Sequence, residues 1–142
     1  MKKTVKASKK GFTLVELIVV LVILAVLAAM LVPALVGYVD KAKAEKEYQT
    51  AATVYGAAQA TITEMYGRDA ISTGTGTISK GTTEGSVAYG AQVLTLAGVD
   101  SSAVSTFNFS YTNYIITGGS VGINGHTYTL TINNGVPSWS AA

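Results

Sequence analysis

The chain has 142 residues, of which 13% are charged and 49% are hydrophobic, and its formal net charge is +2. This composition is too apolar for a disordered chain, and the length suits one globular domain with an appendage. The absence of cysteine excludes a disulfide scaffold, a thiolate metal site and cysteine catalysis, and the single histidine disfavours a metal centre or a Ser-His-Asp triad.

The basic charge is concentrated at the N-terminus. Residues 1–11 contain no acid but five lysines, namely Lys2, Lys3, Lys6, Lys9 and Lys10. The rest of the chain carries all eight acidic residues and the other five basic ones. Such a distribution points to targeting rather than to a nucleic-acid-binding face. We therefore interpret residues 1–11 as a basic leader peptide.

An apolar segment follows the leader, and the 23 residues from Leu17 to Val39 carry no charge. As a helix they would extend roughly 35 Å, enough to cross a hydrocarbon core of about 30 Å. Because lysines lie only on the N-terminal side, the positive-inside rule places residues 1–11 in the cytoplasm and the later part of the chain outside. We interpret residues 12–39 as a transmembrane helix. The alternatives are a plain signal anchor and an ordinary secretory signal cleaved near Ala28 and Ala29.

The helical pattern continues beyond the apolar segment, so we expect one helix from about Thr13 to Tyr66, ended by Gly67. In its second half, apolar residues recur at spacings of three and four, which is typical of an amphipathic helix with one buried stripe. The members of this stripe are Tyr48, Ala51, Ala52, Tyr55, Ala58, Ile62 and Met65.

The remainder of the chain indicates loop and strand. Residues 68–86 are rich in Gly, Ser and Thr and predict a surface loop, and residues 87–97 fit either a short helix or a strand. Later segments alternate apolar and polar residues, with turn signals at Asn124-Gly125, Asn134-Gly135 and Gly118-Gly119. We expect an antiparallel sheet of three or four strands.

The predicted fold is therefore α+β, with a long N-terminal helix packed on a small antiparallel sheet. Residues 40–142, including the second half of the helix, form an extracellular globular domain in this interpretation. No Lys, Arg, Asp or Glu occurs from Ser101 to Ala142. Such a surface can lie against copies of itself without like-charge repulsion, and its edges lack the charges that usually prevent strand pairing.

Few residues offer catalytic or metal-binding chemistry. His126 adjoins a predicted turn, and no carboxylate follows Asp100 that would support it as a general base. The glycines around Lys80 lack the strand-to-helix setting of a phosphate loop. A calcium site would require Asp69, Glu84 and Asp100 to converge through folding. We expect no catalytic residue, cofactor or metal.

The junction Lys10-Gly11-Phe12-Thr13-Leu14-Val15-Glu16 combines a basic leader ending in glycine, an aromatic residue and a carboxylate five residues after the glycine. This GFTLVE string resembles the type IV pilin superfamily, which includes type IV pilins and the pseudopilins of type II secretion and competence systems. In lacking a disulfide, the chain resembles Gram-positive pilins. The resemblance implies that a prepilin peptidase cleaves between Gly11 and Phe12 and methylates the new amine of Phe12.

The resemblance also implies that mature subunits leave the membrane and pack by their helices into a homo-oligomeric filament, driven by a membrane platform and an ATPase. A carboxylate within the membrane costs on the order of 2.5–3.5 kcal/mol and needs a partner. After cleavage the nearest cation for Glu16 is the amine of Phe12, and the resemblance implies pairing between subunits. The alternative places Glu16 at the membrane surface, reaching water.

Pro33 removes a backbone hydrogen bond and predicts a kink. The resemblance implies local melting there during assembly, although Ala25 stands where many relatives have a glycine.

We interpret the chain as a single-pass membrane precursor of a structural subunit in an extracellular pilus, and not as an enzyme. One alternative is a pseudopilin for type II secretion or DNA uptake, and another is an anchored adhesin domain that never polymerises. Nucleic-acid binding would rest on a few dispersed basic residues, with acids interleaved among the first three. These residues are Lys41, Lys43, Lys46, Arg68 and Lys80.

Overall fold

The computed structural model describes residues 11–142, so the five lysines of the predicted leader lie outside the described residues. The chain divides into two compact units, residues 1–42 and residues 43–142. Helix α1 (Leu14–Gly67) runs through the first unit and into the second, close to the predicted bounds.

Within the first unit, every described residue is exposed. Most residues of α1 here are Leu, Val, Ile or Ala, and the helix continues through Pro33 without interruption. This part of α1 is the only described helix long and apolar enough to cross a membrane.

Within the second unit, α1 buries one stripe against the sheet. Four predicted members, Ala51, Ala58, Ile62 and Met65, are buried, but Ala52 is exposed and its assignment to the stripe was wrong. At this point of the helix the buried stripe follows Ala51 and Val54 instead of Ala52. Its remaining buried members are Glu47, Val54, Ala57 and Thr61.

The sheet has five antiparallel strands in the order β1-β2-β3-β4-β5. They are β1 (Thr75–Ser79), β2 (Val104–Thr112), β3 (Ile115–Ile123), β4 (His126–Asn133) and β5 (Val136–Ala141). The α+β class and the helix-on-sheet packing are therefore confirmed, whereas three or four strands was too few. Strand β1 lies in the segment predicted as loop, where buried Ile78 pairs with Phe109 of β2.

Two of the three predicted turns are confirmed. Asn124-Gly125 and Asn134-Gly135 adopt left-handed backbone conformations between paired strands, as two-residue hairpin turns require. The prediction of a turn at Gly118-Gly119 was wrong, because both residues lie inside β3. A Cβ at Gly119 would come within 2.3 Å of the carbonyl oxygen of Asn108, so the close approach of β2 requires glycine there.

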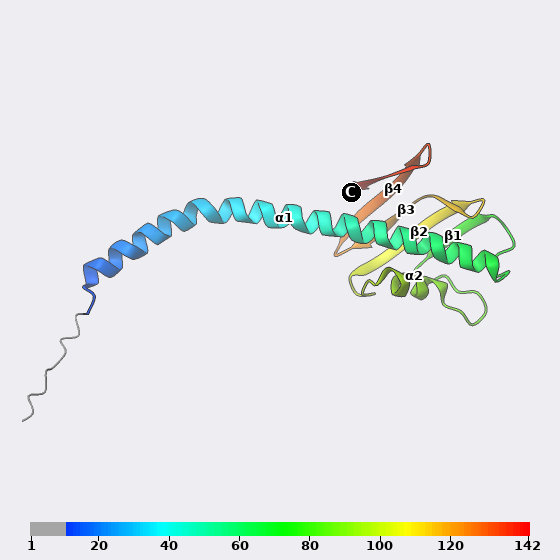
Figure 1. Cartoon of the computed structure of the whole chain (residues 1–142), viewed down its shortest axis with the longest axis horizontal. Helices are drawn as coiled ribbons and strands as arrows, with labels where there is room; N and C mark the ends of the chain where they lie inside the picture. The colour runs from blue at the N-terminus through cyan, green and yellow to red at the C-terminus, as the bar shows by residue number, and fades with distance from the viewer. Residues whose placement is uncertain (1–10) are drawn as a thin grey trace, which may run out of the picture. The chain divides into compact units, whose positions relative to one another are not determined.

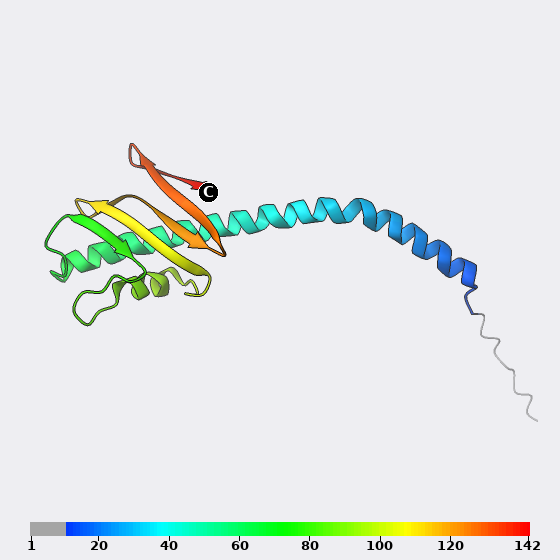
Figure 2. The same ribbon diagram turned by 180° about the vertical axis from the view of Figure 1, so that it is seen from behind.

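Residues predicted as either helix or strand form α2 (Tyr89–Ala97). Its buried residues Tyr89, Val93 and Leu94 join the core that α1 and the sheet enclose, with Phe109 at 0% exposure. Figure 1 shows α1 lying over one face of the sheet, with α2 beside it. Figure 2 shows the opposite face, where no described helix covers β2, β3 or β4.

Candidate functional site

The predicted cleavage site lies immediately before α1. Gly11 and Phe12 are exposed and outside regular secondary structure, and Phe12 is 83% exposed. A Cβ built on Gly11 would meet no described atom within 4 Å. The peptide bond between these residues is therefore accessible to another protein, and the fold of the chain does not itself require glycine at position 11.

Helix α1 begins with a capping box formed by Thr13 and Glu16. The backbone N–H of Thr13 donates to Oε2 of Glu16 over 2.8 Å, and the N–H of Glu16 approaches Oγ1 of Thr13 at 3.3 Å. These reciprocal contacts satisfy two N–H groups that a helix start leaves without helical partners.

Large apolar side chains follow directly on this cap. Leu17, Ile23 and Leu35 are 55%, 54% and 63% exposed, and their neighbours along α1 are similar. Single exposed apolar residues are ordinary on protein surfaces, but a continuous exposed apolar segment marks a surface that another molecule or a membrane covers. Pro33 lies within this segment, next to small residues Ala34 and Gly37.

Comparison with protein families gives one match, to the prokaryotic N-terminal methylation motif over residues 6–32. The match spans the end of the leader, Gly11-Phe12, the capping box and most of the apolar segment before Pro33. The chain carries a type IV pilin-like N-terminal methylation motif. Neither the curated proteins nor the solved structures compared with the chain give a match.

The methylation motif marks the chain as a pilin-like or pseudopilin-like substrate of a prepilin peptidase. It is characteristic of a structural protein family rather than of an enzyme family. One long apolar helix near the N-terminus fits the membrane-anchored precursor that such processing requires. The helix-on-sheet arrangement of the second unit is also consistent with the pilin fold.

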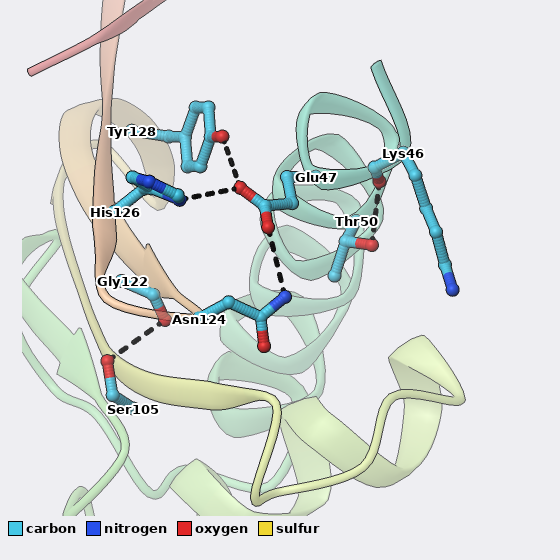
Figure 3. A network of polar contacts seen from close by, with 8 residues as sticks. All are labelled: Lys46, Glu47, Thr50, Ser105, Gly122, Asn124, His126 and Tyr128. Carbon is cyan, nitrogen blue, oxygen red and sulfur yellow. Dashed lines mark hydrogen bonds and ion pairs between the residues drawn. The ribbon is translucent and has the colours of Figure 1, made fainter. Parts of the chain in front are cut away.

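A second polar arrangement lies in residues 43–142, far along the sequence from the methylation motif. Glu47 of α1 meets three side chains at the β3–β4 hairpin, and we call Glu47, Asn124, His126 and Tyr128 the Glu47 cluster (Figure 3). Asn124 donates to Oε1 over 3.0 Å, Tyr128 donates to Oε2 over 2.5 Å, and His126 Nδ1 lies 3.1 Å from Oε2.

The electrostatics of the Glu47 cluster follow from these contacts. The hydrogen bond from Tyr128, and then that from Asn124, lowers the pKa of Glu47, while burial opposes the shift. The same hydrogen bond, with burial, raises the pKa of Tyr128 to about 12. At neutral pH the cluster therefore holds a charged carboxylate and a neutral phenol, an arrangement that fastens α1 to the sheet.

The Glu47 cluster borders a shallow hollow of about 680 Å³ lined by Lys43, Lys46, Thr50 and Asp100, among others. Among residues 11–142, no three His, Cys, Asp or Glu side chains lie close enough together to hold a metal ion. Asp69, Glu84 and Asp100 are thus not brought together.

Sequence reasoning missed two features of these sites. The Thr13-Leu14-Val15-Glu16 segment has the T-x-x-E pattern of a capping box, so a local signal was present. Glu47 had no comparable signal, because Tyr128 lies 81 residues later and only the tertiary fold brings it near.

Proposed function

We propose that this protein is a type IV pilin, a subunit that assembles into an extracellular filament through α1. The observation that carries the proposal is the exposed apolar surface of residues 14–39, directly behind the methylation motif. Removing such surface from water is favourable by a free energy of roughly 25 cal/mol per Å² of apolar area. Lipid covers this surface before assembly, and the helices of neighbouring copies cover it in the filament.

Processing converts the membrane precursor into the assembling form. Cleavage between Gly11 and Phe12 removes the lysine-rich leader but leaves the apolar helix intact. The accessibility of Gly11 and Phe12 supports this site. The reaction leaves an amine on Phe12, which the same peptidase methylates. The leader lysines face the cytoplasm, so residues 43–142 lie on the opposite side of the membrane.

The new amine of Phe12 is a cation next to an apolar segment without Lys or Arg. Glu16 Oε2 accepts from Thr13, whereas Oε1 makes no hydrogen bond to any residue the structure describes. That oxygen is available to the amine of Phe12 on a neighbouring subunit. Pairing there removes the cost of an unpaired charge in lipid and sets the axial position of the incoming subunit.

A membrane platform and its ATPase supply the work that moves each subunit from lipid into the filament. Pro33 weakens the helical hydrogen bonds in the middle of the apolar segment. Neighbouring helices compensate for this loss in the assembled state, which allows α1 to extend locally around Pro33.

Intact-mass and N-terminal analysis of protein from the producing cells tests processing. We expect a mature chain that begins at singly methylated Phe12. A chain that begins at Met1 or near Met30 would contradict the proposal. Gly11→Val should leave the leader attached without altering the fold, since nothing contacts a Cβ at position 11. Gly37→Ala is the matched control, because a Cβ there also meets no described atom within 4 Å.

Electron microscopy of the same cells tests assembly. Long surface filaments that contain this protein, and disappear on its deletion, support the pilin. Assemblies confined to the cell envelope would instead favour a pseudopilin. Surface display without any polymer would favour an anchored adhesin domain.

A further inference from the structure

The uncovered face of the sheet, which we call the hydroxyl face, carries rows of short neutral side chains. Strand register places one residue of each strand in a row across all five strands. One row consists of Thr77, Ser110, Gly118, Thr131 and Ser138. The neighbours of these residues along the strands, such as Ile78, Phe109 and Leu130, are buried on the opposite face.

A second row runs parallel to the first, two residues along each strand. It consists of Ser79, Asn108, Ser120, Thr129 and Ser140. Rows of this kind lie about 6.8 Å apart, and each extends roughly 19 Å across the five strands, given the ordinary rise and spacing of strands. All ten positions of the two rows are Ser, Thr, Asn or Gly.

Exposed faces of antiparallel sheets are usually polar, and this one is polar without a charged residue in either row. The charge-free stretch from Ser101 to Ala142 supplies four of the five strands. The hydroxyl groups of Thr129 and Thr131 make no hydrogen bond to any described residue, although Ser138 donates to the carbonyl oxygen of Thr131 over 3.1 Å. Each hydroxyl donates one hydrogen bond and accepts others.

We propose that the hydroxyl face binds chains of a neutral polysaccharide. Sugar hydroxyls, like those of Ser and Thr, are uncharged and act as both donors and acceptors, so the two surfaces match in chemistry. Ile115 and Val136, which are 62% and 65% exposed, lie at one end of the face and offer apolar contact to the C–H groups of a sugar ring.

A second copy of this chain is the competing occupant of the hydroxyl face. Stable contacts between copies need an apolar centre from which water is excluded, and rows of Ser and Thr bury little apolar area. The sheet is also expected to twist by about 20° per strand, and a flexible glycan chain can follow a row across that twist. These properties favour a single polysaccharide chain.

Each such contact is weak, because hydroxyl groups exchange hydrogen bonds with water for hydrogen bonds with sugar. Repetition along a filament raises the effective affinity, since one long glycan would meet many identical faces. This part of the inference rests on the proposed function as a filament subunit.

The experiment uses filaments sheared from cells and first verified by electron microscopy. Retention of filaments is measured on insoluble cellulose, chitin and starch, with the anionic polysaccharide alginate as comparison. We expect retention on at least one neutral polysaccharide, persisting at about 1 M salt because no charges take part. Retention on alginate alone, or on none of them, would overturn the proposal.

Two substitutions test whether the hydroxyl face is responsible. Thr129→Val removes one hydroxyl while keeping the side-chain shape, and Ser110→Lys places a charge within the other row. We expect each to lower retention roughly tenfold, by weakening each contact and the multivalent binding built on it. Thr95→Lys, at an exposed position of α2, is the matched control and should leave retention unchanged.

Two further results separate the possibilities. If the substitutions abolish bundling of filaments in the absence of polysaccharide and leave retention unchanged, the face binds a second copy and the proposal fails. If no filaments form from the unaltered protein, the pilin function fails. In that case the detergent-solubilised full chain is tested on the same polysaccharides. Its retention on a neutral polysaccharide, lost in Thr129→Val, would support binding by the hydroxyl face, and no retention would overturn the proposal.

Discussion

The phenolic hydroxyl of Tyr128 donates a hydrogen bond of 2.5 Å to Glu47, a residue 81 positions earlier in the chain. The ring of Tyr128 also lies edge-on to Tyr48, with ring centroids 4.9 Å apart. One side chain of β4 therefore contacts two consecutive residues of α1, at the first buried turn of the helix. This contact fixes where α1 meets the sheet.

We expect Tyr128→Phe to lower the free energy of unfolding by about 1.5–3 kcal/mol, the usual contribution of a hydrogen bond to a charged group. The ring and its contact with Tyr48 are kept, so the change isolates the hydroxyl. Urea unfolding of the detergent-solubilised chain, followed by fluorescence of the single Trp139, measures the effect. Tyr66→Phe at an exposed position is the control. Equal stability of the two variants would show that the hydrogen bond contributes nothing.

Stability should fall in acid because of Glu47. Its pKa is lowered in the folded protein, so its contribution is complete above its ordinary value of 4.5 and is lost as pH falls through the folded value. The hydrogen bond from the backbone N–H of Ser102 lowers the pKa of Asp100, so the contribution of Asp100 to stability is also lost in acid. Unfolding measured from neutral to acid pH should show a shallower loss in Glu47→Gln than in the unaltered chain. Parallel curves would assign the acid sensitivity elsewhere.

Alkaline conditions should affect Tyr128 in the opposite sense. Its pKa is raised from 10.0 to about 12, so its contribution is complete below pH 10 and disappears as pH rises toward 12. Phenolate absorbance should reveal a late-titrating tyrosine that is missing in Tyr128→Phe. Burial also raises the pKa of Tyr111, so the comparison with Tyr128→Phe makes the assignment. A late phase that persists in this variant would contradict it.

The two roles of Glu16 can be separated by a pair of substitutions. Thr13→Val removes the hydroxyl of the capping box but keeps the carboxylate, whereas Glu16→Ala removes both the cap and the charge. We expect Glu16→Ala to abolish filaments while the membrane-inserted level of the protein rises or stays level. Thr13→Val should cost about 1 kcal/mol of helix stability and still permit filaments.

Counting filaments by microscopy and quantifying the processed subunit by mass spectrometry gives the readout for this pair. Loss of filaments in both variants, with processing intact, would mean that Glu16 acts only by capping the helix. Filaments in Glu16→Ala would remove charge pairing from the assembly mechanism.

The path of α1 was largely predictable, because its apolar and amphipathic halves leave distinct periodic patterns. The exact face was less predictable. Ala52 and Val54 are both apolar and two residues apart, yet only Val54 is buried. Exposing a small alanine side chain costs little free energy, so the spacing of apolar residues alone does not decide whether Ala52 or Val54 faces the sheet.

Turns and strands were predictable where local chemistry dominates. Asn-Gly pairs adopt left-handed conformations readily, and both predicted Asn-Gly turns are present. The β2–β3 turn uses Asn113 and Tyr114 instead, with φ of 52° and 63°. Tertiary contacts stabilise it, since Gln59 of α1 accepts from the N–H of Ile116 and donates to the carbonyl oxygen of Tyr114. No local signal at Tyr114 indicates such support.

The N-terminal motif could be identified from sequence because its parts are contiguous, and the methylation motif match over residues 6–32 confirms that identification. Cleavage between Gly11 and Phe12 and the pairing of Glu16 with the amine of Phe12 stay predictions. The hydroxyl face, in contrast, depends on strand register. The sequence shows that Ser101–Ala142 lacks charge, but only the pairing of Thr77 of β1 with Ser110 of β2 extends the rows to a fifth strand.

The order of the strands in the sheet follows their order in the chain, so every strand pairs with its neighbour in sequence. Contacts between sequence neighbours close short loops and form quickly. Strands β2 to β5 can therefore form hairpin by hairpin, without waiting for distant segments. The longer-range steps are the pairing of β1 with β2 across the segment that holds α2 and the closure of α1 on the strands, and we expect these steps to limit the folding rate.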